Sequence, residues 1–120
     1  MSNRSKAALA GLRVVECGEL VSAAYATKLM ADLGAEVIKV EPPEGERARQ
    51  RGPFPEGHEG DPEASGLFLY LNANKRGVTL DLGSDRGREQ FIELLAGADV
   101  LIHNLGVRAA RAWRVDYAAV

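Results

Sequence analysis

The chain has 120 residues, of which 46 % are hydrophobic and 27 % are charged, and its formal net charge is −2. This composition is ordinary for one globular domain, and the balanced charge argues against a broad surface for nucleic acid. No apolar run approaches the roughly 20 residues of a membrane span. With a single cysteine, no disulfide can form inside the chain. We therefore expect a cytoplasmic protein that binds neither nucleic acid nor membrane.

Residues 9–41 predict a strand, a helix and a second strand joined by tight turns. The β-branched runs Leu12–Cys17 and Glu36–Val40 are typical of buried strands. Between them, apolar residues at spacings of three and four predict an amphipathic helix, with Ser22 as its N-cap and Gly34 at its C-terminal end. The residues expected on its buried face are Tyr25, Ala26, Leu29, Met30 and Leu33. Such a βαβ unit predicts parallel strands and a right-handed crossover.

Residues 42–66 predict a long loop, because all five prolines of the chain fall here among interleaved glycines. Loops of this length are usually functional or mobile. The loop contains a basic run, Arg47, Arg49 and Arg51. Two interpretations stay open for this run: a solvated charged segment, or a local cluster that binds a phosphorylated small molecule.

Residues 67–120 predict a return to regular structure. An apolar run, Leu67–Leu71, is followed by a polar turn and by two expected strands, Val78–Leu82 and Asp99–Asn104. A helix is expected to begin at Ser84 and Asp85. Its apolar face comprises Phe91, Leu94, Leu95 and Ala98. A short helix or turn is expected over residues 106–113.

Ligands of α/β sheets bind at the carboxyl ends of strands, and this rule points to residues 18–22, 41–43, 72–76 and 104–108. The first of these turns can offer backbone N–H groups to a phosphate or acyl oxygen. It lacks the G-x-G-x-x-G pattern of nicotinamide sites, and no Walker A lysine is present. The segment 72–76 (Asn-Ala-Asn-Lys-Arg) is the most suggestive, because asparagine tolerates left-handed turns and the cations suit phosphate. A merely polar turn is the alternative.

Other reactive side chains give weaker signals. The carboxylates of Glu16, Glu19 and Glu41 could act as general bases, but most such groups are simply solvated. Cys17 at a strand end is more often a small core residue than a nucleophile. The two histidines share no metal-like spacing with it, so we expect no metal site.

Taken together, these segments resemble a known family. LAGLRVVECGELVSAAYATKLMADLGAEVIKVEPP resembles the opening of family III CoA-transferases, the L-carnitine dehydratase / bile acid-inducible protein F group. This group includes formyl-CoA transferase and α-methylacyl-CoA racemase. LYLNANKRGVTLDLGSDRGREQFIELLAGADVLIHN resembles the stretch that follows, and RVDYAAV resembles the family's G-L-D-Y segment. The resemblance covers nearly all of residues 9–120, in order and with consistent spacing.

The resemblance implies an α/β fold: the Rossmann-like N-terminal part of the family III domain, spanning residues 9–120 after a tail of residues 1–8, and incomplete. It implies that the fold cradles coenzyme A, without a metal. The implied partners are an acyl-CoA, a carboxylic acid and a second copy in an interlocked homodimer. Family transferases use an aspartate nucleophile that attacks the thioester, whereas racemases move an α-proton. That aspartate follows the G-L-D-Y segment, so no residue here is expected to be catalytic and the fragment is expected to be inactive alone.

The resemblance also implies a set of coenzyme contacts. They are Leu20, Val21, Asn72, Ala73, Asn74, Lys75, Asn104, Leu105, Gly106 and Arg108. The sequence departs from the common family pattern at residues 22–24, where many members have A-G-P, and at residues 105–108, where F-R-P-G is usual. The arginine of that F-R-P-G pattern is then replaced by Arg108 or Arg111, at a shifted position. Three interpretations stay open: part of a CoA-transferase, part of a racemase-type isomerase, or a non-catalytic half of a fused protein.

Overall fold

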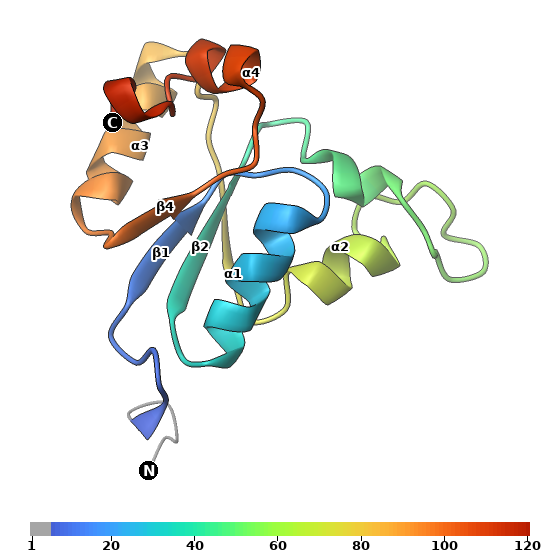
Figure 1. The fold of residues 1–120 in the computed structure, drawn as a ribbon. Coiled ribbons are helices and arrows are strands. Elements are labelled where there is room, and N and C mark those ends of the chain that lie inside the picture. The colour runs from blue at the N-terminus through green and yellow to red at the C-terminus, as the bar shows by residue number, and fades with distance from the viewer. Residues whose placement is uncertain (1–5) are drawn as a thin grey trace.

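A computed structural model describes residues 6–120, so the first five residues of the expected tail lie outside the described part. The described chain forms a parallel four-stranded sheet in the order β3-β2-β1-β4, with helices on both faces (Figure 1). The strands are β1 Arg13–Glu16, β2 Glu36–Glu41, β3 Arg76–Thr79 and β4 Val100–Ile102. The helices are α1 Ser22–Asp32, α2 Gly66–Leu71, α3 Asp85–Ala96 and α4 Val107–Ala112, with short 3-10 turns η2 Arg47–Gln50 and η3 Tyr117–Ala119. The predicted α/β class is confirmed.

The strand order explains why the helices divide between the two faces. The chain moves outward from β1 to β2 and then to β3, and it returns past β1 to reach β4. Right-handed crossovers in opposite directions place their helices on opposite faces. Accordingly α1 lies on one face of the sheet, while α3 and α4 pack on the other (Figure 1). Within residues 6–120, every helix is too short or too polar to cross a lipid bilayer.

Each face of the sheet has its own apolar core. On the α1 face, Val14 and Val37 pack against Ala31 and Ala35. On the opposite face, Phe91 of α3 is fully buried in a larger cluster that contains the strand residues Val15, Val40 and Cys17, with Leu80, Leu82, Ala110 and Val115. The apolar face predicted for α3 is confirmed, because Leu94, Leu95 and Ala98 pack against the same cluster. Ser84 caps this helix by accepting a hydrogen bond from the Gly87 N–H at 3.0 Å.

The buried face predicted for α1 is wrong except at Met30, which packs against the core on this face of the sheet. Tyr25, Leu29 and Leu33 are 45 %, 45 % and 51 % exposed. The helix meets the sheet through small residues, namely Ala23, Ala24, Thr27 and Ala31. Ser22 is not the N-cap either, because the helix begins at Ser22 itself, after Val21, which makes no side-chain cap. The C-terminal glycine is confirmed, since Gly34 has a φ of +104°.

The strand predicted over residues 78–82 begins earlier than its alternating pattern indicated. Residues 67–71 form helix α2, and β3 starts at Arg76, which lies beside Ile38 of β2. It ends at Thr79, beside Glu41. Leu80 and Leu82 are buried beyond the end of the strand. Backbone pairing with β2 therefore set the strand boundaries, which side-chain alternation could not reveal.

The proline-rich loop is tied to the sheet. The Nε and Nη2 of Arg49 donate to the two carboxylate oxygens of Glu41 at 2.7 and 2.8 Å. Its guanidinium carbon lies 3.7 Å from the centre of the Phe68 ring. Ser65 donates from its hydroxyl to the Ala48 carbonyl at 2.8 Å. The solvated interpretation of the basic run is therefore wrong for Arg49.

Gly87 offers a test of the connection between β3 and α3. A Cβ at this position would lie 1.8 Å from the carbonyl oxygen of Asp81, which is backbone and cannot move aside cheaply. We expect Gly87→Ala to lower the free energy of unfolding by about 3 kcal/mol, measured by urea denaturation. Gly77→Ala is the matched control, because no atom lies within 4 Å of its added Cβ. Equal stability of the two variants would contradict this packing.

Candidate functional site

A groove lies where the strand order reverses. The chain leaves β1 toward β2 but arrives at β4 on the other side of β1, so the switch point lies between β1 and β4. Open α/β sheets bind ligands in the crevice outside the carboxyl ends of such a strand pair. Here we find a groove of 640 Å³. It is lined by Glu19, Leu20, Val21, Ser22, Arg47, Asn104, Leu105, Gly106, Ala109 and Trp113.

The side chain of Asn104 joins the two walls of the groove. Its Oδ1 accepts from the Glu19 N–H at 2.8 Å, and its Nδ2 donates to the Glu19 carbonyl at 2.7 Å and to the Ser22 hydroxyl at 2.8 Å. Gly18 is required beside it, because an added Cβ would lie 2.8 Å from Asn104 Oδ1. The amide of Asn104 therefore fixes the segment after β1 relative to the segment after β4.

The turn from β1 into α1 lines the groove and contains backbone donors that lack a partner within residues 6–120. Leu20 has a φ of +58°, an uncommon conformation for a bulky residue. Its N–H donates to Glu46 Oε2 at 2.8 Å. The next two amides, of Val21 and Ser22, find no hydrogen-bond partner among residues 6–120. Unpaired N–H groups at the start of a helix suit a phosphate or another anionic oxygen.

A smaller hollow adjoins the groove at the carboxyl ends of β2 and β3. It has a volume of 130 Å³ and is lined by Val40, Pro42, Pro43, Glu44, Leu80, Asp81, Leu82, Gly83 and Trp113. Trp113 lines both the groove and this hollow. Of these residues, the sequence pattern pointed to Pro42 and Pro43 but not to residues 80–83 or Trp113. The carboxyl-end rule would have found residues 80–83 had the strand been placed at 76–79.

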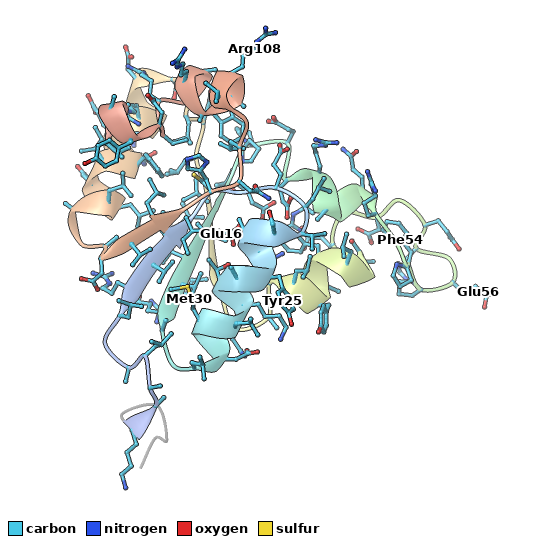
Figure 2. The ribbon with its side chains drawn as sticks, in the orientation of Figure 1. Glu16, Tyr25, Met30, Phe54, Glu56 and Arg108 are labelled. Atoms are coloured by element: carbon cyan, nitrogen blue, oxygen red, sulfur yellow. The ribbon has the colours of Figure 1, made fainter. Side chains whose placement is uncertain are left out.

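A buried charge cluster lies beneath the turn, between the sheet and α1. It comprises Glu16, Lys39, Glu46 and Lys75, whose side chains are at most 2 % exposed. Figure 2 shows Glu16 beside α1, and Thr27 of that helix donates to Glu16 Oε1 at 2.9 Å. Lys39 Nζ lies 2.9 Å from Glu16 Oε2 and 3.1 Å from Glu46 Oε1. With two charges of each sign, the cluster is neutral when all four groups are ionised.

The segment 72–75 is not at the carboxyl end of a strand. The apolar run before it forms helix α2 and not a strand, so the segment follows a helix and precedes β3. Asn74 does adopt the left-handed turn that its residue type suggested, with a φ of +66°. Lys75 Nζ donates to Glu16, to the Ala24 carbonyl and to Asn72 at 2.8–2.9 Å. All three of its N–H donors are thus engaged inside the protein, and a phosphate would have to displace one of them.

The remaining predicted residues fall into two groups. Leu20, Val21, Asn104, Leu105 and Gly106 line the groove, and their contact with coenzyme A stays a prediction. Ala73 and Asn74 do not line it, and Asn74 donates instead to Asp32 at 3.1 Å. Arg108 also lies outside the groove and points away from the molecule (Figure 2).

Burial shifts the pKa of two side chains near the turn, Cys17 and Lys75. Burial raises the pKa of the Cys17 thiol to about 12, so this group is a core residue and not a thiolate nucleophile. Burial is also the largest influence on Lys75 and lowers the pKa of its ammonium, although Glu16 opposes the shift. Among residues 6–120, no group of three or more histidine, cysteine, aspartate or glutamate side chains is arranged to hold a metal ion.

A family model for CoA-transferase family III matches residues 9–120. The chain belongs to this family. A succinyl-CoA:mesaconate CoA-transferase of Haloarcula hispanica is 44 % identical over 98 residues, which cover 81 % of this chain and 24 % of that protein. A formyl-CoA:oxalate CoA-transferase of Streptomyces coelicolor is 41 % identical over 101 residues, covering 82 % of this chain and 23 % of that protein. The chain therefore spans about a quarter of the length of these relatives.

Solved structures support the same assignment. A CaiB/BaiF family protein from Brucella suis aligns with a TM-score of 0.82 and 36 % identity, over 94 % of this chain and 30 % of that one. A hypothetical protein from Mycobacterium tuberculosis aligns with a TM-score of 0.79 and 32 % identity over 94 % of this chain and 30 % of that one. The family III resemblance in the sequence is confirmed, and so is the α/β fold that it implied.

The buried carboxylates of this family III chain predict a loss of stability in acid. Burial would raise the pKa of Glu16, but Lys39 and Lys75 lower it below its ordinary value of 4.5. The pKa of Glu41 is likewise lowered, because hydrogen bonds from Arg49 and the Glu46 N–H outweigh burial. As the pH falls, the unfolded chain therefore binds protons before the folded one. We expect the free energy of unfolding to decrease as the pH falls below 4.5.

Urea denaturation from neutral pH to about pH 3 would measure this effect. Glu16→Gln is the comparison, because it removes one of the titrating groups and should flatten the pH dependence. A free energy of unfolding that stays constant in acid would contradict the ionised state of the two carboxyls.

Lys39→Met tests the balance of charge in the cluster. It leaves Glu16 and Glu46 buried with one ammonium between them, so we expect a loss of about 3–5 kcal/mol in the free energy of unfolding. Lys28→Met is the control, because Lys28 pairs with Asp32 at 2.9 Å on the surface of α1 and should matter little. A similar result for both variants would show that the buried cluster contributes no more than a surface pair.

Proposed function

We propose that this chain is the coenzyme A-binding N-terminal part of an acyl-CoA:carboxylate CoA-transferase. The observation that supports the proposal is the position of the groove. It lies at the switch point of a family III sheet, and it is lined by Val21 and Ser22, whose amides have no partner within residues 6–120. The CoA-transferases named above share this part of the chain.

The chemistry of the groove fits a CoA thioester. Leu20, Leu105 and Trp113 offer apolar walls to the thin pantetheine arm, while the amides suit a phosphate or acyl oxygen. Arg47 adds a cation, 60 % exposed, whose Nη1 lies 3.4 Å from Glu19 Oε2. We propose that Leu20, Val21, Leu105 and Gly106 contact the coenzyme. Asn104 holds the two walls of the groove together through its hydrogen bonds.

The transfer itself requires a free carboxylate that attacks the thioester carbon, which displaces the CoA thiolate and forms an acyl anhydride. We propose that this aspartate is supplied by a part of the family III protein beyond these residues. Among the residues that line the groove, the one carboxylate is Glu19, and it pairs with Arg47. Glu16, Glu41 and Glu46 are buried in ion pairs. We therefore propose that these 120 residues do not turn over by themselves.

We favour a transferase over a racemase because the curated relatives described above are CoA-transferases by name. We further propose that the full protein acts on an acyl-CoA and a carboxylic acid, as a homodimer in the cytoplasm. The resemblance described from the sequence supports the dimer, and the single buried cysteine fits a reducing compartment.

Isothermal calorimetry with coenzyme A tests the proposed binding, using the protein in its full natural length. We expect Asn104→Ala to weaken binding about tenfold, because it removes three hydrogen bonds that shape the groove. Arg76→Ala is the control, because this exposed side chain lies at the other end of the sheet beside Glu36. Absence of heat with the folded, unmodified protein would refute the proposal.

A thioester-exchange assay tests the proposed inactivity. We expect these 120 residues to exchange no CoA between an acyl-CoA and a free carboxylic acid, while the protein in its full natural length does so. Sustained turnover by the 120 residues would show that one of their own carboxylates serves as the nucleophile.

A further inference from the structure

We propose that Glu46 is a positioning residue for the groove, holding the turn from β1 into α1 in the shape that points its free amides at the ligand. The inference rests on the proposed function, because it takes the groove as the site of coenzyme A. Glu46 itself is not among the residues that line the groove.

The contact between Glu46 and the turn is direct. One carboxylate oxygen, Oε2, accepts the Leu20 N–H at 2.8 Å and the Ala48 N–H at 3.2 Å. Leu20 is the residue with a φ of +58°. A branched side chain in this left-handed region costs of order 1 kcal/mol and persists where its surroundings hold it. The hydrogen bond to a charged acceptor is strong enough to offset that cost.

The other oxygen of Glu46 explains why the carboxylate is held in place. Oε1 is buried, accepts no hydrogen bond, and lies 3.1 Å from the ammonium of Lys39. This contact is therefore Coulombic, and it orients Oε2 toward Leu20. Lys39 sits in β2 and also pairs with Glu16 at the end of β1. The turn is thus fixed to the two central strands through a carboxylate that comes from the loop after β2.

The consequence for ligand binding follows from the order of residues. The amides of Val21 and Ser22 come directly after Leu20, so the Leu20 backbone angles set their direction. If Leu20 relaxed to an ordinary negative φ, these two donors would turn away from their present positions. Glu46 would then affect coenzyme binding without touching the coenzyme.

The test compares Glu46→Gln with Val37→Ala in the protein in its full natural length. Glutamine has nearly the same shape, but it cannot satisfy both Lys39 and the Leu20 N–H, because one of its ends is a donor. Val37→Ala is the control for loss of stability, since Val37 is 1 % exposed in the core between α1 and the sheet and does not line the groove. For Glu46→Gln we expect a Kd for coenzyme A that is about tenfold higher. We also expect KM for acyl-CoA to rise with little change in kcat.

Hydrogen exchange of the Leu20 amide, followed by NMR, gives a readout that does not depend on binding. We expect slow exchange at Leu20 compared with the unpaired Val21 amide in the unmodified protein, and fast exchange at both in Glu46→Gln. Val37→Ala should leave the Kd and the contrast between the two amides unchanged. If Glu46→Gln does not fold, equal exchange at Leu20 and Val21 in the unmodified protein would still overturn the positioning role.

The outcomes separate this inference from the proposed function. Equal exchange at Leu20 and Val21 in the unmodified protein, or an unchanged Kd in Glu46→Gln, would overturn the positioning role. An equal loss of affinity in Val37→Ala would overturn it as well, because the effect would then follow stability alone. If the unmodified protein did not bind coenzyme A, the proposed function would fail, and the Leu20 amide would still decide whether Glu46 holds the turn.

Discussion

Four charged side chains enclosed between the sheet and α1 constrain this structure more than any other group of contacts. Burying a charge is costly unless it is paired, so Glu16, Lys39, Glu46 and Lys75 require one another. They come from β1, β2, the loop after β2 and the residue before β3. Pairing them therefore fixes segments that are far apart in the sequence against one helix, α1, whose Thr27 and Ala24 also contact the cluster.

The cluster also determines how α1 packs. The carboxyl half of this sheet face is occupied by charged side chains, and the amino half carries Val14 and Val37. A helix that lies over both must approach closely through small residues, and α1 does so with alanines and Thr27. Its larger apolar side chains consequently face outward, where Tyr25 and Leu29 are 45 % exposed.

The buried charge cluster and the turn that covers it differ in how completely their polar groups are hydrogen-bonded. In the cluster, Lys75 uses all three donors, and Glu16 accepts from two lysines and a threonine. In the turn, the amides of Val21 and Ser22 have no partner within residues 6–120. Apart from Glu46 Oε1, which meets Lys39 without a hydrogen bond, the side chains of the cluster are paired. A paired layer that supports unpaired donors is what a binding site needs, because the support gains little by moving toward the ligand. This division fits a family III chain in which the groove binds and the cluster supports.

The sequence by itself determined the opening βαβ unit, the parallel α/β class and the family, and it predicted residues that line the groove. These follow from local patterns: β-branched runs, the glycine after α1, the serine cap of α3, and polar residues that follow β1 and β4. It failed where the answer depended on which side chains meet. Lys75 looks like a phosphate ligand from its neighbours in sequence, but it contacts Glu16, 59 residues away. Glu46 and Trp113 gave no local signal, because tertiary packing alone brings them to the turn and the groove. The tertiary structure thus decided which charges are paired inside and which donors remain for a ligand.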